Sequence, residues 1–194
     1  QTLFNTPTGR FEFFSTNIEL AVNDLAQKRE RQPALQKMGI TAKGDEAFMP
    51  HYEASPSAVD KKKYPLRMVP YELINLSSDW LPNPPYLKKT LFDHQLTKNE
   101  SFAEINPKTA AEHNLKQGDR AIIQSPKGEV RVRVNLFNWA MPGVVYLPLG
   151  LGHTAYDDYQ RGQGVNPNEI IDGGKDPLSG QTVWWETHAR IIKV

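Results

Sequence analysis

The stretch from residue 104 to residue 149 constrains the fold most, because its turn and cap signals mark where each element begins and ends. Asn106 can accept a hydrogen bond from a free N–H group at a helix start, and Pro107 suits the first helical position. A short helix is therefore predicted to begin at Pro107. Gly118 supplies a residue that tolerates φ > 0 at the turn that leads out of this helix.

After this helix, the spacing of the apolar residues changes from a helical period to that of a strand. Residues 121–123 form an apolar run, residues 125–128 (SPKG) form a turn, and valines then alternate with polar residues over 130–135. This pattern predicts a β-hairpin with one solvent-facing side. A Pro-Gly turn at 142–143 leads into residues 144–147, which are apolar enough for a strand buried on both faces.

The first and last strands of the same domain are predicted at residues 66–75 and 183–194. Pro70 lacks an N–H donor and should mark a strand edge or a bulge. The order of strands with one short helix differs from the strand and long-helix alternation of a doubly wound domain. A mainly β protein with short helices is expected, and a small closed barrel is the economical solution because closure removes exposed strand edges.

Four motifs in this region follow one another in a recognisable order: INP-x-TA-x-x-x-x-L-x-x-GD, SP-x-G, MPGVV and GLGH. At these spacings they resemble the C-terminal molybdopterin-dinucleotide-binding domain of the molybdopterin oxidoreductase superfamily. The resemblance implies a double-psi β-barrel of the aspartate-decarboxylase-like type over residues 64–194. It covers residues 66–194 and, separately, residues 4–15, which are similar to the TPSGK-x-E-x-x-S segment ahead of that domain.

Residues 1–63 are accordingly expected to be the tail of a preceding domain and a connecting loop, in a chain that is a piece of a larger protein. Residues 4–15 contain a Pro-Thr-Gly turn between aromatic runs and predict a hairpin. Residues 16–19 (TNIE) match a capping box, so a helix is predicted from there to about Arg31. Pro33 should break or restart the helix, and residues 41–63 should form an extended connection.

Composition narrows the classes of partner. The 23 basic and 22 acidic residues nearly balance, so no long-range field attracts nucleic acid or an anionic membrane, and the three lysines at 61–63 are interpreted as solvated surface. No apolar run approaches the roughly 20 residues that cross a bilayer, so neither direct membrane insertion nor a nucleic-acid partner is expected. The absence of cysteine removes disulfides, thiolate metal ligands and a cysteine nucleophile.

A dinucleotide with a pyrophosphate needs backbone N–H donors that approach closely, polar side chains for the ring edges, and some apolar walls. Two loops meet that description, at residues 75–85 and 150–166. The resemblance places 75–78, 153–154 and 166 by position against a pterin dinucleotide. The predicted cofactor-binding residues are Asn75, Ser77, Ser78, Asn83, Gly152, His153, Thr154, Asn166 and, as a weaker candidate, Gln181.

Structural interpretations of the same residues stay open. Asn75 and the serines after it are common turn formers, His153 could be a satisfied structural histidine, and Asn166 before Pro167 is a frequent turn initiator. Large aromatic residues near these loops are interpreted as packing or interface residues rather than stacking partners. They are Tyr156, Tyr159, Trp184 and Trp185.

No catalytic residue and no metal ligand are predicted within this chain. Asp157 and Asp158 are adjacent, so their side chains should point apart, and the histidines lack metal-site spacing. Nucleophile and phosphate-loop signatures such as G-x-S-x-G and G-x-x-x-x-G-K-S do not occur. The histidines considered are His51, His94, His113 and His188.

The resemblance implies a domain that binds and orients molybdopterin guanine dinucleotide, carrying molybdenum or tungsten in the intact enzyme, while the isolated domain has no turnover of its own. It further implies three partners: upstream domains of the same subunit, an iron–sulfur subunit and a membrane quinone-binding subunit. The expected location is the periplasmic face of the cytoplasmic membrane.

The motif GHTAY…Y-x-x-G-x-GVNP resembles the quinone-linked respiratory branch of the superfamily more closely than the soluble formate dehydrogenases or nitrate reductases. That branch includes enzymes of the menaquinone reductase and alternative complex III type. Some members of that branch carry no molybdenum cofactor, so the cofactor could have been lost. The alternative function is therefore a cofactor-free scaffold in a membrane quinone-linked complex. A free-standing barrel module is the least favoured possibility, because residues 4–15 match the upstream segment.

Overall fold

The structure, a computed structural model, describes residues 3–26, 31–53, 59–76, 89–155, 158–176 and 179–194. The chain separates into two compact units: residues 1–56 with 175–181, and residues 57–174 with 182–194. The division into an upstream segment of residues 1–63 and a barrel domain of residues 64–194 stays a prediction. Within the described ranges, no helix is long and apolar enough to cross a bilayer.

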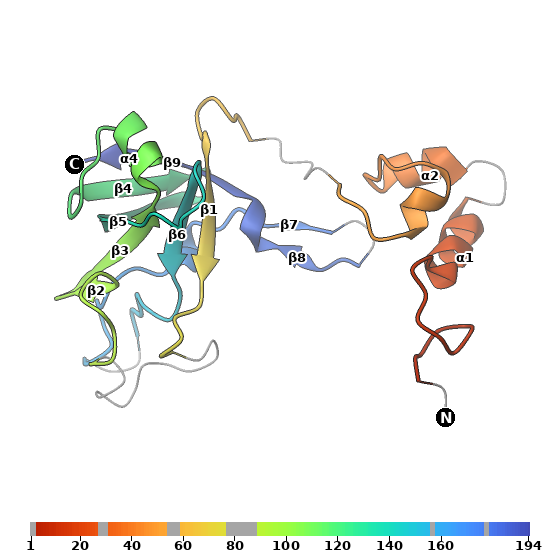
Figure 1. The fold of residues 1–194 in the computed structure, drawn as a ribbon, viewed down its shortest axis with the longest axis horizontal. Coiled ribbons are helices and arrows are strands. Elements are labelled where there is room, and N and C mark those ends of the chain that lie inside the picture. Colours follow the sequence, from red (N-terminus) through yellow and green to blue (C-terminus); the bar gives the residue numbers. More distant parts are fainter. Residues whose placement is uncertain (1–2, 27–30, 54–58, 77–88, 156–157, 177–178) are drawn as a thin grey trace. The chain divides into compact units, whose positions relative to one another are not determined.

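The second unit is a closed β-barrel (Figure 1). Its strands follow the order β3-β5-β4-β9-β1-β6, and β6 pairs again with β3 to complete the circle. The pairs β1–β6 and β3–β5 are parallel, whereas the other pairs are antiparallel. The six strands are β1 Leu66–Tyr71, β3 Glu100–Ile105, β4 Arg120–Ser125, β5 Gly128–Leu136, β6 Val144–Pro148 and β9 Thr187–Lys193. The short β2 Leu96–Thr97 extends the sheet beside β3.

The predicted hairpin and the predicted buried strand are both present. The β4–β5 hairpin turns at residues 125–128, and the valines of β5 at 130, 132 and 134 are buried while Arg131 is exposed. In β6, every residue except Tyr146 is buried. The inward-facing side chains form one core, as the period of two along each strand requires. Its fully buried members include Met68, Ala103, Ile105, Ile123, Val134, Val145, Leu147, Ile170 and Ala189.

The predicted helix start is also confirmed. Helix α4 spans Pro107–Glu112, with Pro107 at its first turn, and the Oδ1 of Asn106 accepts from the backbone N–H of Lys108 at 2.9 Å. Gly118 has a φ of 78°, in the left-handed region that the turn requires. The helix itself ends earlier, at Glu112, where Asn114 has a left-handed φ of 56° and the N–H of Leu115 donates to the carbonyl of Ala110; Gly118 serves the later turn into β4.

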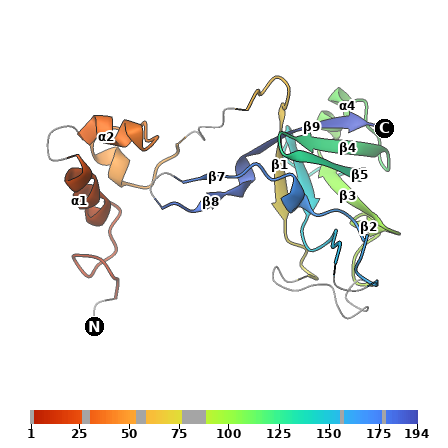
Figure 2. The same ribbon diagram turned by 180° about the vertical axis from the view of Figure 1, so that it is seen from behind.

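Two strands are shorter than predicted. β1 ends at Tyr71 rather than at residue 75, and β9 pairs with it only as far as Met68, so Pro70 lies beyond that ladder. The closing strand begins at Thr187 because residues 184–186 form the 3-10 helix η3, Trp184–Glu186, after the two-residue strand β8, Thr182–Val183. Figure 2 shows the sheet from behind, with β9 continuing from η3.

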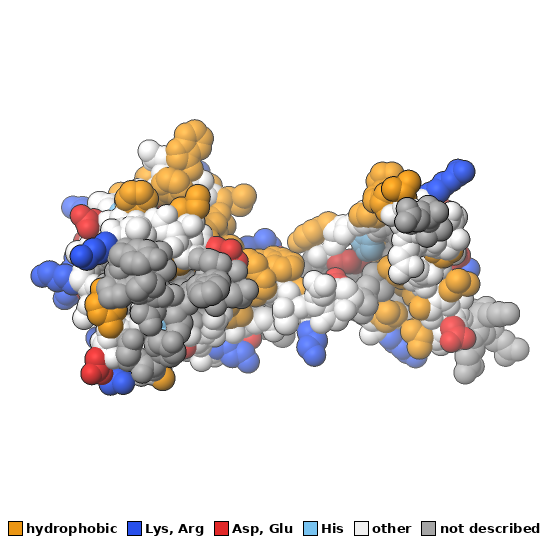
Figure 3. Space-filling model, turned by 90° about the horizontal axis from the view of Figure 1, so that it is seen from below, with side chains coloured by type: hydrophobic (Ala, Val, Ile, Leu, Met, Phe, Trp, Pro, Cys, Tyr) orange, Lys and Arg blue, Asp and Glu red, His pale blue; other side chains and the backbone are white. Residues whose placement is uncertain are grey.

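Apolar side chains also reach the surface of the protein (Figure 3). In the turn between β5 and β6, Trp139 is 88% exposed and Met141 is 62% exposed. Trp184 and Trp185 pack edge to face at 5.3 Å and stay partly exposed. The interpretation of these tryptophans as an interface stays a prediction.

Among its described residues, the first unit contains the α-helices α1 Thr16–Leu25 and α2 Arg31–Lys37 and the 3-10 helix η1 Gly44–Phe48. Their apolar sides meet in a small core of Val22, Leu35, Ile40, Ala47 and Phe48. The predicted helix end near residue 31 is wrong, since α1 ends at Leu25 and Arg31 opens α2.

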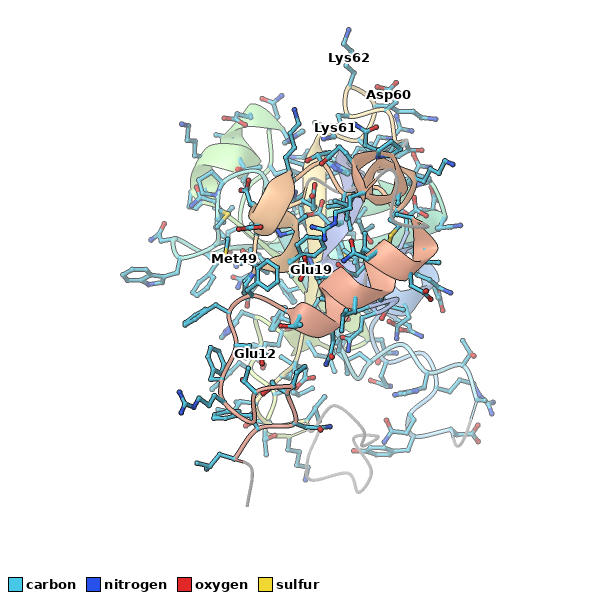
Figure 4. All side chains as sticks on the ribbon, turned by 90° about the vertical axis from the view of Figure 1, so that its right-hand side faces the viewer. Glu12, Glu19, Met49, Asp60, Lys61 and Lys62 are labelled. Carbon is cyan, nitrogen blue, oxygen red and sulfur yellow. The ribbon has the colours of Figure 1, made fainter. Side chains whose placement is uncertain are left out.

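The predicted cap position of α1 is off by one residue. The N-cap is Ser15, whose hydroxyl accepts from the N–H of Ile18 at 3.3 Å, whereas Thr16 is already helical. Ser15 is extended and precedes the first helical residue, which is the geometry that an N-cap requires. In Figure 4, Glu19 lies on this helix and Glu12 lies on the loop before it.

The predicted hairpin over residues 4–15 is wrong for the described residues. Its turn exists, with the N–H of Gly9 donating to the carbonyl of Thr6 at 2.9 Å, but no strand pairing flanks it. The Glu12 carboxylate instead accepts from both the N–H and the hydroxyl of Thr8. Such local side-chain bonds compete with a β-ladder.

Candidate functional site

The barrel unit carries a pocket of about 290 Å³ where the first residues of β5 face the long loop after β6. Its lining combines charged side chains of β5 and η2, Pro167–Glu169, with the glycine-rich backbone of the loop. The lining residues are Glu129, Val130, Arg131, Gly152, His153, Thr154, Gly162, Gly164, Val165, Asn166 and Glu169. The pocket therefore brings together four predicted ligand residues and three charged residues that were not predicted to bind a ligand.

Two glycines hold the loop in this shape. A Cβ on Gly152 would lie 2.1 Å from the backbone nitrogen of Asn166, and a Cβ on Gly164 would lie 2.2 Å from the hydroxyl oxygen of Ser101. Both glycines also have positive φ values, 78° and 73°. Only glycine allows such close approach without strain, so these two positions set the walls of the pocket.

Internal hydrogen bonds fasten the loop. The N–H of Val165 donates to the hydroxyl of Ser101 on β3, which anchors the far end of the loop to the barrel. Four N–H groups are committed: Gly152 to Gln163 O at 2.7 Å, Gly162 to His153 O at 3.1 Å, Gly164 to Asn99 O at 3.0 Å, and Val165 to Ser101 Oγ at 3.0 Å. These four amides are therefore already satisfied within the chain.

His153 lines the pocket, and one of its ring nitrogens has no partner. Its Nε2 is buried and makes no hydrogen bond with any described residue. A buried polar atom without a partner is unfavourable by about 1–3 kcal/mol, so native proteins rarely leave one. A structural, satisfied histidine would have such a partner, whereas a polar ligand atom would satisfy this one.

Asn166 has a local structural role as well as a place in the pocket wall. Its Oδ1 accepts from the N–H of Asn168 at 3.1 Å, which caps the 3-10 helix η2. The turn interpretation is therefore correct for its side-chain oxygen. The predicted ligand role of its amide group stays a prediction.

Two other predicted ligand residues, Asn75 and Gln181, do not line the pocket. The Nδ2 of Asn75 donates at 2.7 Å to the carbonyl of Thr90, fifteen residues further along the chain. Gln181 is exposed in the turn between β7, Gly174–Lys175, and β8, and its carbonyl accepts from Asp176. Ser77, Ser78 and Asn83 lie outside the described residues.

The two predicted loops nevertheless begin side by side. β1 and β6 are parallel neighbours, so the segments that follow them leave the barrel at the same end. Leu76 and Leu151 are buried in one apolar cluster, and a Cβ on Gly150 would lie 3.3 Å from the Leu76 side chain. The parallel pairing, rather than any one motif, brings these segments together.

Glu129, Arg131 and Glu169 were not among the predicted site residues. The alternation of β5 already places Glu129 and Arg131 on its solvent-facing side, and that signal could have drawn attention to them. Glu169 offered no such signal, because its place depends on how the loop folds back onto Gly128 at the start of β5. Among the residues that the structure describes, no cluster of three metal-binding side chains exists.

Comparison with known families agrees with this geometry. The family model "Molydopterin dinucleotide binding domain" matches residues 83–184, which is more than half of the chain. This chain belongs to the molybdopterin dinucleotide binding domain family. The predicted double-psi β-barrel is confirmed by the family and by the closed barrel. The cofactor class of the family is a molybdopterin dinucleotide.

Two curated relatives show the kind of protein in which such a domain occurs. The menaquinone reductase molybdopterin-binding-like subunit of Nitratidesulfovibrio vulgaris is 31% identical over 147 residues, covering 76% of this chain and 21% of that protein. The arsenate respiratory reductase molybdopterin-containing subunit of Shewanella sp. strain ANA-3 is 31% identical over 201 residues, covering 98% of this chain and 24% of that protein. The chain thus spans less than a quarter of the length of these relatives.

A solved structure shares the fold. Acetylene hydratase from Pelobacter acetylenicus aligns with a TM-score of 0.62 and 16% identity, covering 97% of this chain and 24% of that one. At this level of identity, the likeness concerns the fold alone.

Proposed function

We propose that this chain is the C-terminal part of a molybdopterin oxidoreductase subunit and that its pocket binds and orients part of a molybdopterin guanine dinucleotide. The single observation that carries the proposal is that four predicted ligand residues line one pocket of a domain that belongs to this family: Gly152, His153, Thr154 and Asn166. A pocket of this size with polar and charged walls fits a flat, polar heterocycle.

The residues of this chain have positioning roles in the proposal. When bound, the pterin dinucleotide would carry molybdenum or tungsten and supply redox chemistry, while metal ligands would come from upstream domains. His153 would offer its ring nitrogen to the cofactor, Thr154 its hydroxyl, and Asn166 its side-chain nitrogen. Gly152 would keep the loop backbone close to that of Asn166, so the chain binds and orients without itself reacting.

The proposed setting is a quinone-linked respiratory complex. Two observations support this setting. The motif at residues 150–167 resembles the quinone-linked branch, and the relatives are a menaquinone reductase subunit and an arsenate respiratory reductase subunit. The proposed partners are upstream domains of the same subunit, an iron–sulfur subunit and a membrane quinone-binding subunit. The proposed place of assembly is the periplasmic face of the cytoplasmic membrane.

The test uses the full-length subunit purified from its own host, with elemental assay for molybdenum and tungsten and fluorescence assay of the released, oxidised pterin. Near-stoichiometric metal and pterin are expected in the wild type. His153→Ala should lower both contents severalfold, whereas His113→Ala, beyond α4 and outside the pocket lining, should leave both unchanged.

A cofactor-free scaffold is the second candidate, because one relative is named molybdopterin-binding-like. Absence of metal and pterin from a correctly assembled wild-type complex would overturn the cofactor proposal and leave this scaffold function. In that case His153→Ala would be expected to change neither assembly nor electron transfer.

A further inference from the structure

The charged groups of the pocket suggest which part of the cofactor it takes, an inference that rests on the proposed function. Two carboxylates, Glu129 and Glu169, and one guanidinium, Arg131, line the pocket. Glu129 Oε2 already accepts from the Gln124 side chain at 3.1 Å. Among the described residues, the side chains of Glu169 and Arg131 make no hydrogen bond or ion pair, so both are available to a ligand.

A pyrophosphate would find few partners in this pocket. Phosphate sites in proteins are built from free backbone N–H groups and cationic side chains. Here four N–H groups of the glycine-rich loop are committed to acceptors within the chain. The charged side chains of the lining carry an excess of negative charge, which disfavours a second anion.

The same groups match a ring edge that presents hydrogen-bond donors. A 2-amino-4-oxopyrimidine ring carries a ring N–H beside an exocyclic amino group, and these two parallel donors fit the two oxygens of one carboxylate. The adjacent oxo group is an acceptor and suits an arginine fork. A cavity of about 290 Å³ has room for such a bicyclic ring system rather than for a whole dinucleotide.

We propose that this pocket holds the 2-amino-4-oxopyrimidine edge of the cofactor, with Glu169 accepting from the ring N–H and the amino group and Arg131 donating to the oxo group, and that the pyrophosphate lies outside it. Guanine and pterin both contain this ring, so either end of the dinucleotide could supply it. His153 lines the same pocket.

Binding of small probes to the purified chain tests this assignment without any redox assay. The probes are guanosine, pterin, inosine and lumazine, the last two lacking the 2-amino group, and inorganic pyrophosphate. Amide chemical shifts of Gly152 and Gly164 report occupancy of the pocket. Guanosine or pterin should bind at least about tenfold more tightly than its counterpart without the amino group, because one charge-assisted hydrogen bond is lost.

Glu169→Gln should weaken binding of the preferred probe about tenfold or more, since an amide replaces one carboxylate oxygen with a donor. Glu112→Gln is the matched control, because Glu112 is exposed at the end of α4 and does not line the pocket. Preference for guanosine identifies the nucleotide end of the cofactor as the occupant, and preference for pterin identifies the other end.

Three results would overturn the assignment: no probe binding at the pocket, equal binding of inosine and guanosine together with equal binding of lumazine and pterin, or pyrophosphate binding that Glu169→Gln strengthens. The proposed function is tested by a different experiment, the metal and pterin contents of the full-length subunit. If the full-length subunit contains metal and pterin but Glu169→Gln leaves probe binding unchanged, the proposed function stands and the assignment of the ring edge is refuted.

Discussion

The barrel unit and the first unit reach order by different means. In the barrel, strands far apart in the sequence close a hydrogen-bonded circle around a core of sixteen buried residues. In the first unit, the described core consists of five buried residues between short helices. Hydrogen bonds from Thr41 and Ala42 to the Glu53 carboxylate also stabilise this unit. Phe11 and Phe13 are more than half exposed there, and the Phe11 ring packs edge to face on both Phe4 and Phe13. A large core makes the barrel tolerant of surface change, whereas the first unit depends on a few contacts.

The largest loss of stability should come from a large-to-small substitution in the barrel core. Ile105→Ala removes a side chain with no exposed surface at the point where β3 meets both β5 and β6. We expect the free energy of unfolding of the barrel to fall by about 4 kcal/mol, from lost burial and the cavity left behind. Native-state hydrogen exchange should show lower protection throughout the barrel strands.

The amides of α1 should keep their protection in Ile105→Ala if the two units unfold separately. Leu35→Ala, in the core of the first unit, is the reciprocal variant and should lower protection in α1 but not in the barrel. Equal loss of protection in both units in either variant would contradict the comparison and indicate one cooperative unit.

The next largest effect concerns the loop that shapes the pocket. Gly152→Ala combines a positive φ with a Cβ placed against the backbone of Asn166, so we expect a loss of about 3 kcal/mol from strain and overpacking. Gly162→Ala is the matched control, because it has a similar φ but open space around its Cβ, and should cost about 1 kcal/mol. Urea unfolding measures both, and equal losses would show that the backbone approach at Gly152 is unimportant.

Substitutions of Asn106 should change the free energy of unfolding less, and they should distinguish its two roles, capping α4 and holding the turn at residues 138–141. Its Oδ1 caps α4, while its Nδ2 donates to the carbonyl of Ala140 at 2.8 Å in the turn that carries Trp139. Asn106→Ala should cost about 1–2 kcal/mol, and Asn106→Asp, which keeps the cap oxygen, should retain most of the helix stability. Backbone relaxation of residues 138–141 should increase in both variants; an unchanged turn would mean that Nδ2 contributes little.

The smallest expected effect is a pH dependence confined to the first unit. Hydrogen bonds from the N–H of Ala42 and from Thr41 lower the pKa of Glu53 to about 2. Because the folded-state pKa is below the ordinary value of 4.5, the carboxylate stabilises the fold above about pH 4.5 and ceases to do so as the pH falls toward 2. Exchange protection of the Thr41 and Ala42 amides should decline over that range.

In Glu53→Gln the same protection should already be reduced at pH 7 and should vary less with pH. Asp45→Asn is the control, since Asp45 is exposed in η1 and its side chain has no hydrogen-bond partner among the described residues. A wild-type protection profile that stays flat from pH 5 to pH 2 would show that this carboxylate does not hold the segment.

Sequence alone was most informative where a local physical rule decides the geometry. Asn106 and Pro107 fixed the start of α4, and the alternating valines of β5 fixed which side is buried, because both signals act within a few residues. It failed where alternatives of similar energy compete: Ser15 rather than Thr16 caps α1, and residues 4–15 form a turn without strands.

The site was only partly predictable for a related reason. His153 and Asn166 stood out because glycine-rich and turn-forming neighbours mark a binding loop. The charges opposite them, on β5 and η2, come from segments that meet only after the loop has folded back onto the barrel. Asn75 looked equally suitable in sequence, but its side-chain amide donates to the carbonyl of Thr90, fifteen residues away. Hydrogen bonds over such distances depend on the whole fold, and no local pattern encodes them.

The position of β9 has a consequence for how the protein is made. β9 alone joins β4 to β1, so until residues 187–193 have been synthesised both of those strands keep an unpaired edge. Closing the circle pairs Leu66 with Ala189, and contacts of such long sequence separation form slowly. Nearly the whole barrel must therefore leave the ribosome before it can close, and during that interval its exposed edges are open to pairing with other chains and to chaperones.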